Sequence, residues 1–483
     1  MAVTIAQEPL YDTLPIGQQV IFAISEDTIV ATKYKVKFIA EVHVRGYNIN
    51  LSTNTALIGA FKTTPNNAGV GIFDLRPVLE TFVKPDHLGS TFGNGSRYKE
   101  TDVTHPLHLI DKFSLAPNSI KNFAIQFKVE FSDTATGSVI APGDPGNTNN
   151  ASNSIQYRMF NGVLQYDDAL TLGKIDASGS LVAGNNYGYN LESFYLDDVL
   201  TPGNFLSNAP TTQYARLTDY GTLPFFNYLP NPSSSGSDRV TQIRFKYYDS
   251  SGSILNQEVL DNDWTNGSST NVGTQVHNRL VFCGAFPANL RGWSTMFRGL
   301  VTADVLSYYT VVAEDAAGEV SELYTINIIC PNERGYEGIR LTWLNQWGVW
   351  DYYTFNKKSV RSISTNRTSY TQLGGTWNES TFKINGYKGG KKNFRVNSSE
   401  KIKLNTGFVT EAEGLWFEEL INSTEVYIVK EFSTDVAGTI TNKYIDPVVV
   451  TTSSYVKKTI ANNKVMQYSI EIEKSKMQRT QSV

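Results

Sequence analysis

The sequence predicts a mainly β protein, made of several antiparallel β-sandwich-like domains with one or two short helices. Only 18% of the 483 residues are charged, whereas 12% are aromatic, including 26 Tyr and 25 Phe. Aromatic and β-branched side chains suit a pleated, half-buried strand, and a helical protein would carry more Ala, Leu, Glu and Lys. Several segments also alternate apolar and polar residues, the pattern of a strand with one solvated face. The length exceeds what one core supports, so we expect about three domains.

An N-terminal β-domain is predicted over residues 1–165. Two segments, 34–44 and 123–131, place an apolar side chain at every second position, with mostly polar side chains between them. The alternation places Ile39 and His43 on the solvated face of the first segment. Two more strands, a short helix that Asp74 caps, and a loop rich in Gly, Pro and Asn are expected at 57–62, 70–73, 74–82 and 136–153.

The middle of the chain divides into an irregular β/loop region, 166–239, and a second β-domain, 240–330. The first has weak periodicity and contains the loop-like run PNPSSSGS at 230–237. In the second, the run YYTVVAEDAAGEVSELYTINI at 308–328 resembles the last two strands of an immunoglobulin or fibronectin type III module. Strands are expected there at 240–248, 254–260, 308–313 and 320–329.

A C-terminal β-domain is predicted over residues 331–483, and it begins with an aromatic corner, RLTWLNQWGVWDYYTF, at 340–355. Trp343, Trp347 and Trp350 lie within eight residues of one another there. Each aromatic side chain buries on the order of 150–250 Å². The alternation predicts a strand, a tight turn and a second strand. So many aromatic side chains must pack on a large surface or be covered by a partner chain.

One clear helix is predicted at 410–422. Thr410 and Glu413 form a capping box at its start. Its apolar face comprises Ala412, Leu415, Trp416, Phe417, Leu420 and Ile421. We expect the aromatic corner to pack on this helix, with Trp343 and Phe355 inside. Strands are expected at 370–373, 382–387, 401–409, 426–429, 448–451 and 466–472, followed by a frayed tail after Lys474.

The succession of RLTWLNQWGVWDYYTF and TGFVTEAEGLWFEELINSTEVYIV carries a family pattern. It resembles a family of tail or baseplate structural proteins of tailed phages that infect Bacteroidetes-type bacteria. In that family a W/F-L-N-x-x-G-x-x-D-x-x-x-F segment precedes a helix of the E-x-x-W-x-x-E-L-x-x-S-x-E-V-Y type. The matching positions here are Trp343, Leu344, Asn345, Gly348, Asp351 and Phe355, then Glu413, Trp416, Glu419, Leu420, Ser423, Glu425, Val426 and Tyr427.

The resemblance covers the last third of the chain specifically. The run GVGIFDLRPVLE at 69–80 resembles that family's opening domain more loosely. Where the family has small or apolar residues around the glycine, this chain has Trp347 and Trp350. The resemblance implies a structural component of a virion.

Local chemistry indicates how the aromatic corner is held. Asn345 is expected to bond backbone groups of the turn at 346–348, and Gly348 to supply a positive φ. Three interpretations stay open for Trp347, Trp350 and Tyr352: a place in the core, a contact with another subunit, or stacking on sugars. The residues expected to serve structure or assembly are Trp343, Asn345, Trp347, Gly348, Trp350, Asp351, Phe355, Trp416 and Leu420.

The sequence offers little for catalysis. His105, His108 and Asp111 are spaced so that they could hold a metal, but Pro106 and the lack of a fourth ligand favour ordinary polar roles. The basic turn KGGKKN at 388–393 is expected to be solvated. GxSxG, Walker and HExxH motifs are absent. Paired carboxylates could cleave glycans but fit turn residues better, namely Asp197, Asp198, Asp261 and Asp263. We therefore expect no enzyme activity, no cofactor and no bound metal.

The charge of the chain is unevenly distributed. The formal net charge of −4 argues against a dedicated nucleic-acid-binding protein. From residue 331 onward 21 Lys and Arg stand against 15 Asp and Glu, a charge of +6, which leaves −10 for the first 330 residues. An acidic front and a basic back could help copies stack head to tail, although a solvated surface is the simpler meaning.

Cysteine usage and segment hydropathy bear on location. Cys283 and Cys330 are too few for a metal site or a disulfide framework, and they fit buried side chains in a reducing compartment. The N-terminal run lacks a basic region followed by an apolar one, and no stretch approaches the ~20 apolar residues of a membrane span. We expect a soluble protein, made in the host cytoplasm and located in the virion tail.

The leading functional expectation is a non-enzymatic virion component, such as a distal-tail or tail-ring protein. It would form a symmetric homo-oligomer and join other tail or baseplate proteins, without binding nucleic acid or inserting into a membrane. One alternative is a tail adhesin that recognises host surface glycans through loops such as 136–153 and 230–237. A glycan-cleaving tail enzyme is less favoured, because it needs two carboxylates that converge in a groove.

Overall fold

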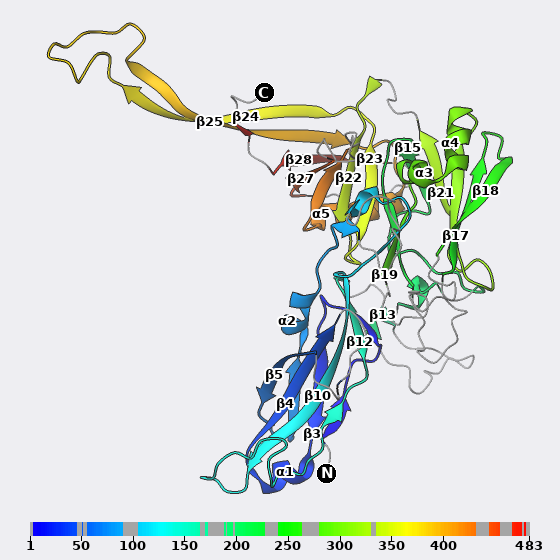
Figure 1. The fold of residues 1–483 in the computed structure, drawn as a ribbon, viewed down its shortest axis with the longest axis vertical. Coiled ribbons are helices and arrows are strands. Elements are labelled where there is room, and N and C mark those ends of the chain that lie inside the picture. Colours follow the sequence, from blue (N-terminus) through cyan, green and yellow to red (C-terminus); the bar gives the residue numbers. More distant parts are fainter. Residues whose placement is uncertain are drawn as a thin grey trace. The chain divides into compact units, whose positions relative to one another are not determined.

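The chain forms two compact units, whose elements are labelled in Figure 1. Unit 1 comprises Met1–Ile329 and Leu344–Asp351, and unit 2 comprises Cys330–Trp343 and Tyr352–Val483. The finer division into four regions stays a prediction. The computed structural model describes residues 3–45, 51, 56–89, 105–164, 170–171, 188–189, 191–196, 199–227, 240–262, 280–329, 335–430, 444–454, 466–475 and 478–479.

Strands make up most of the regular structure, so the predicted mainly β class is confirmed. The described residues contain more helices than the one or two predicted: α1 (Asp27–Thr32), α2 (Arg76–Leu79), α3 (Pro287–Trp293), α4 (Thr295–Thr302) and α5 (Glu411–Asn422). The three additional helices, α1, α3 and α4, have only six to eight residues, too few for a clear helical period. No helix in the described ranges is long and apolar enough to span a bilayer.

In the N-terminal part of unit 1, two sheets pack face to face. One sheet is formed by β2 (Thr13–Pro15), β12 (Tyr157–Phe160), β10 (Ile120–Ser132), β4 (Tyr34–Arg45) and β5 (Leu57–Thr63), with β11 (Ser152–Asn153) beside β10. The other is formed by β1 (Thr4–Gln7), β3 (Ile21–Ser25) and β6 (Val70–Asp74). The ring of Phe127 in β10 lies 5.5 Å from that of Phe22 in β3 and 6.0 Å from that of Phe73 in β6.

The sequence pattern located these strands correctly but misjudged one face. Ile39 and His43, predicted to be solvated, are 5% and 0% exposed. They lie in β4, which pairs with β10 on one side and β5 on the other, and whose second half is covered on both faces. The predicted helix at 74–82 is present as α2 and a 3-10 turn, but Leu75 and not Asp74 is its N-cap.

The rest of unit 1 contains a five-stranded sheet and a three-stranded sheet. The first has the order β15 (Thr212–Arg216), β21 (Tyr324–Ile329), β20 (Tyr308–Glu314), β17 (Gln242–Tyr248) and β18 (Ile254–Asp261). The second has the order β16 (Thr222–Phe226), β19 (Leu280–Gly284) and β9 (Phe113–Leu115). Short pairs join β7 (Leu88–Gly89) to β8 (His105–Pro106) and β13 (Leu170–Thr171) to β14 (Gly188–Tyr189).

All four strands predicted at 240–329 are present, but helices share in covering their sheet. Phe245 of β17 packs against Trp293 of α3, with ring centroids 6.0 Å apart. Tyr247 packs against Phe297 of α4 at 5.8 Å. An immunoglobulin-like module would place a second sheet there. In addition, β15 pairs in parallel with β21, which two adjacent hairpins would not produce.

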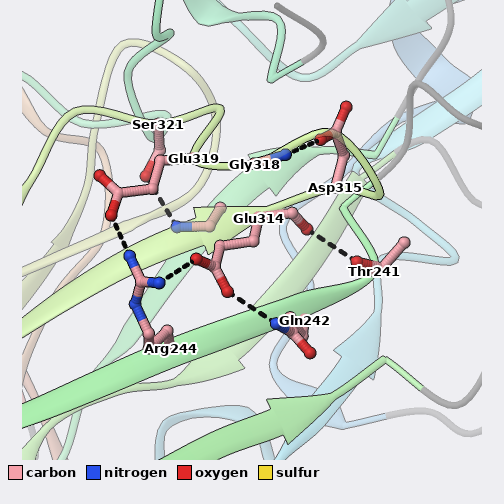
Figure 2. Close-up of polar contacts among 9 residues, drawn as sticks. Thr241, Gln242, Arg244, Glu314, Asp315, Gly318, Glu319 and Ser321 are labelled. Carbon is pink, nitrogen blue, oxygen red and sulfur yellow. Dashed lines mark hydrogen bonds and ion pairs between the residues drawn. The ribbon is translucent and has the colours of Figure 1, made fainter. Parts of the chain in front are cut away.

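An ionic network closes the turn between β20 and β21, as Figure 2 shows. Arg244 of β17 bonds Glu314 at 2.5 Å and also pairs with Glu319. Within the turn, the carboxylate of Asp315 accepts a hydrogen bond from the backbone N–H of Gly318 at 2.8 Å. The run EDAAGE therefore forms the hairpin turn that the sequence predicts, and a cation of the neighbouring strand holds it.

Unit 2 is one large sheet with a single α-helix among its described residues. The sheet has the order β23 (Trp350–Phe355), β22 (Ile339–Leu344), β26 (Val426–Val429), β27 (Ile445–Val450), β28 (Ser469–Lys474), β25 (Gly390–Asn405) and β24 (Val360–Gln372), and β29 (Gln478–Arg479) pairs with β25. Three predictions were wrong here. Residues 382–387 form no strand, β24 begins ten residues before the predicted 370, and the expected frayed tail contains β29.

Candidate functional site

The aromatic corner at 340–355 is a hairpin of β22 and β23, as predicted. The Asn345 side-chain oxygen accepts hydrogen bonds from the backbone N–H groups of Trp347 at 3.0 Å and Val349 at 3.3 Å. Gly348 has a φ of 70°, a conformation that a side chain disfavours. A Cβ at this position would also lie 1.7 Å from the backbone oxygen of Asn161. Asn345 and Gly348 therefore hold the turn in the way that the sequence predicts.

The base of the hairpin packs on α5 in unit 2. Trp343 and Phe355 are buried, with ring centroids 4.9 Å from Trp416 and 6.1 Å from Phe417. The capping box at the start of α5 is present, and Leu420 is buried. The predicted packing of corner on helix is thus confirmed. The predicted apolar face of the helix was too broad, since Ala412 and Leu415 are exposed.

The turn of the hairpin, Leu344–Asp351, belongs to unit 1. Trp347 packs against Phe194, with ring centroids 4.0 Å apart. Trp350 meets His108 edge-on at 5.1 Å, and its indole N–H donates to the backbone oxygen of Asp86 at 2.8 Å. The sequence could not indicate these contacts, because each joins residues far apart in the chain.

Burial decides which interpretation of the aromatic residues holds within this chain. Trp347, Trp350 and Tyr352 are all nearly inaccessible, and Asp351 is buried with them. Arg340 is buried as well, where it donates to the Thr354 hydroxyl at 2.9 Å. These side chains offer no face on which a sugar could stack. Their part in assembly stays a prediction.

Beside Trp350, the carboxyl of Asp86 is buried and well bonded. It accepts hydrogen bonds from the backbone N–H of Ser119 at 2.8 Å, from the Ser119 hydroxyl at 2.7 Å and from the Asn118 side chain at 2.7 Å. Burial raises the pKa of this carboxyl, and the hydrogen bonds oppose the rise. The carboxyl fixes the loop that carries the Trp350 acceptor, which is a structural role.

The residues considered for metal or catalysis do not assemble into a site in the described part of the chain. No group of three or more His, Cys, Asp or Glu in the described ranges could hold a metal. His108 lies in a 3-10 turn, buried against Trp350 and not on a loop surface. Cys283 is buried and unbridged, and burial raises the pKa of its thiol. The side chain of His105, and Asp197, Asp198, Asp263, Cys330 and the run 230–237, lie outside the described residues.

A long two-stranded ribbon is the most exposed element of the described structure. It comprises β24, β25 and the segment between them, residues 360–405, and we call it the arm (Figure 1, yellow and orange). Every residue of β24 except the last is exposed. β25 pairs with β28 and β29 only from Asn397 onward. Residues 390–396 therefore have β24 as their sole partner among the described strands.

The end of the arm presents apolar side chains to solvent. Trp377 and Ile384 are each 81% exposed, Phe394 is 78% exposed and Tyr387 is 75% exposed. Leu373 and Phe382, in the same part of the arm, are also exposed. Phe394 stands at an irregularity in the strand register, between Arg395 and Asn393, which face Thr368 and Ser369. A bulge of this kind re-aims a side chain, and contiguous exposed apolar groups mark interaction sites.

The arm is also strongly basic. Residues 360–405 contain nine Lys and Arg and two Glu, a net charge of +7, so the remainder of a chain of charge −4 carries −11. Within the described structure no acidic partner meets five of these cations, namely Arg367, Lys388, Lys391, Lys392 and Arg395. The arm therefore combines an apolar end with unbalanced positive charge, as binding surfaces do.

The sequence pattern does not predict this exposed surface. The sequence predicts a solvated turn at KGGKKN, 388–393, and a strand at 382–387. A usable signal was present, since Trp377, Phe382 and Tyr387 lie in a stretch rich in Gly, Asn, Ser and Thr with no alternation to bury them. Aromatic residues in such a stretch indicate either a core loop or an exposed contact.

Comparison with known proteins adds no family. No protein-family model matches the chain, and no curated protein matches it. Among the solved structures that match is the crystal structure of Salmonella alpha-2-macroglobulin reacted with methylamine, with 8% sequence identity and a TM-score of 0.17. The match covers 97% of this chain and 22% of that chain. A likeness at this TM-score carries no argument about fold or function.

Proposed function

We propose that this protein is a non-enzymatic structural component of a phage virion that self-assembles through its arm. The observation that supports this proposal is the arm itself, which is exposed along β24 and ends in exposed aromatic side chains. An isolated two-stranded hairpin is at best marginally stable in water, and its outer strands leave rows of backbone groups unpaired. A partner that covers the end of the arm removes both liabilities.

The place in the virion rests on the family resemblance of the C-terminal region. The hairpin of β22 and β23 and the helix α5 form its matching segments, and the base of the hairpin packs on the helix. We assign the protein to the tail or baseplate, as a distal-tail or tail-ring protein in contact with copies of itself and with other tail proteins. Closed symmetry would use every arm and leave no exposed end.

A second candidate is a tail adhesin that binds host surface glycans. The observation in its favour is that Trp377 and Tyr387 expose flat aromatic faces, which stack well on sugar rings. Glycan-array binding that is lost in a Trp377→Ala, Tyr387→Ala double variant supports this role. If the assembled protein binds no polysaccharide, the adhesin role is ruled out.

The experiment on the leading proposal compares the assembled mass of two variants. The arm variant replaces Trp377, Phe382, Ile384 and Tyr387 by Ser. The control variant replaces four residues of unit 1 by Ser that are each more than half exposed, namely Ile72, Ile155, Tyr214 and Ile254. Light scattering coupled to size-exclusion chromatography should show assemblies for the parent protein and the control, and monomers for the arm variant. A parent protein that is monomeric at every concentration, alone and with neighbouring tail proteins, contradicts the proposal.

A further inference from the structure

A second exposed surface, on unit 1, has the chemistry opposite to that of the arm. The N–H of Gly203 donates to the oxygen of Val320 at 2.9 Å, and the N–H of Glu322 donates to the oxygen of Gly203 at 2.8 Å. A Cβ added to Gly318 in the β20–β21 turn would lie 3.6 Å from the Cγ1 of Val199, so the segment before Gly203 lies beside this turn. The surface, which we call the acidic patch, comprises Val199, Leu200, Asp315, Glu319, Glu322 and Leu323.

The acidic patch is apolar as well as acidic. Leu200 is 86% exposed, and Val199 and Leu323 are exposed as well. Glu319 and Glu322 are exposed, and Figure 2 shows Glu319 and Asp315 at the turn. The sequence from 299 to 329 contains five Asp or Glu and no Lys or Arg. Arg244 pairs with Glu319, and Glu322 has no ion pair within the described ranges.

We propose that the arm of one copy docks on the acidic patch of a second copy. This inference rests on the proposed self-assembly and identifies the surface on which the arm docks. The arm carries +7, and the acidic patch has three carboxylates, of which only Glu319 has an ion pair among the described residues, so arm and acceptor attract each other. Burying Leu200 and Leu323 under Trp377 and Ile384 removes exposed apolar area from both surfaces.

Anionic lipid is the competing partner for a basic and aromatic arm end. A second copy is favoured because the acidic patch supplies acidic and apolar groups together, which matches the mixed character of the arm. A single contact between two copies would also cover both exposed surfaces, the arm and the acidic patch. A contact of this kind is heterologous, so it closes into a ring or continues as a filament.

Cross-linking between two singly substituted proteins tests the contact directly. Trp377→Cys in the arm and Leu200→Cys in the acidic patch change exposed side chains, so both variants should fold. They are made with Cys283→Ala and Cys330→Ser to remove the native thiols. A mixture of the two treated with a short bis-maleimide should give a cross-linked dimer. A mixture of Trp377→Cys with Ile155→Cys, exposed elsewhere on unit 1, should not.

Charge exchange tests the specificity of the same contact. Lys391→Glu with Lys392→Glu in the arm, or Glu322→Lys with Leu323→Lys in the acidic patch, should each weaken assembly at least tenfold. Mixing the two double variants should restore mixed assemblies. If the patch variant assembles as the parent does and Leu200→Cys gives no cross-link, the acidic patch is not the acceptor. The proposed self-assembly is unaffected by that result. A monomeric parent protein that sediments with anionic phospholipid vesicles overturns both proposals.

Discussion

At the residue scale, burial separates two tryptophans with different roles. Trp343 is fully buried on α5, whereas Trp377 is 81% exposed at the end of the arm. Trp343→Ala should lower the free energy of unfolding of unit 2 by about 3–5 kcal/mol, because it removes buried area and leaves a cavity. Trp377→Ala should change stability by less than about 0.5 kcal/mol. Urea unfolding followed by circular dichroism measures both, and equal effects would refute the assignment.

Gly348 tests the geometry of the hairpin turn. Its φ of 70° and the 1.7 Å approach of Asn161 leave no room for a side chain. Gly348→Ala should therefore cost at least about 2 kcal/mol of unfolding free energy. The matched control is Gly386→Ala in the arm, where nothing lies within 4 Å of an added Cβ. The midpoint of thermal unfolding measures the difference in stability loss between the two variants. Equal losses would show that the turn at Gly348 has room for a side chain.

His43 predicts how the stability of unit 1 depends on pH. Burial lowers the pKa of this histidine below its usual 6.5, with Glu41 opposing the fall and Lys128 adding to it. The folded state then favours the neutral ring, so its stabilising contribution is complete above pH 6.5 and is lost as the pH falls below that value. His43→Leu should flatten the decline of the urea midpoint between pH 6.5 and pH 5. An unchanged slope would contradict the assignment.

The sequence predicted the roles of Asn345 and Gly348 because they depend on neighbours a few residues away. It did not predict what surrounds Trp347 and Trp350. Their partners, Phe194, His108 and Asp86, lie more than 150 residues earlier in the chain, and no local pattern relates them. Turn chemistry is local, whereas the choice of a packing partner is set by the whole fold.

At the element scale, two structures of unit 2 differ in how well their sequences predict them. The helix α5 carries a capping box and an apolar face, so its start and its end at Asn422 were predicted closely. The strand β24, VRSISTNRTSYTQ, has eight Ser, Thr, Asn or Gln among 13 residues. It buries no face, so it has no apolar alternation to detect, and only its last residues were predicted.

The charge of the arm makes assembly sensitive to salt. Exposed charges are screened beyond a Debye length of about 10 Å at 0.1 M salt and about 3 Å at 1 M. Because five cations of the arm lack an acidic partner in the described structure, the assembly should weaken markedly between these salt concentrations. Sedimentation velocity across a salt series checks this. A salt-independent assembly would show that apolar contacts alone carry it.

At the scale of the whole molecule, the mainly β class followed from composition, but the division into units did not. Leu344–Asp351, the turn with the adjoining strand ends, belongs to unit 1, while the rest of β22 and β23 belongs to unit 2. A sequence pattern assigns a hairpin to the domain in which it stands in the sequence, so it could not predict that this turn belongs to the other unit. The excess of positive charge after residue 330 was visible, and the structure places most of it on the arm.

The central claim is that copies of this chain assemble through the arm. The most direct measurement is the mass in solution of the parent protein and of the four-Ser arm variant, by sedimentation equilibrium under one set of conditions. Our account predicts a multiple of 53.7 kDa for the parent protein and 53.7 kDa, within the mass lost by substitution, for the variant. Equal masses for the two, whether monomeric or assembled, would contradict it.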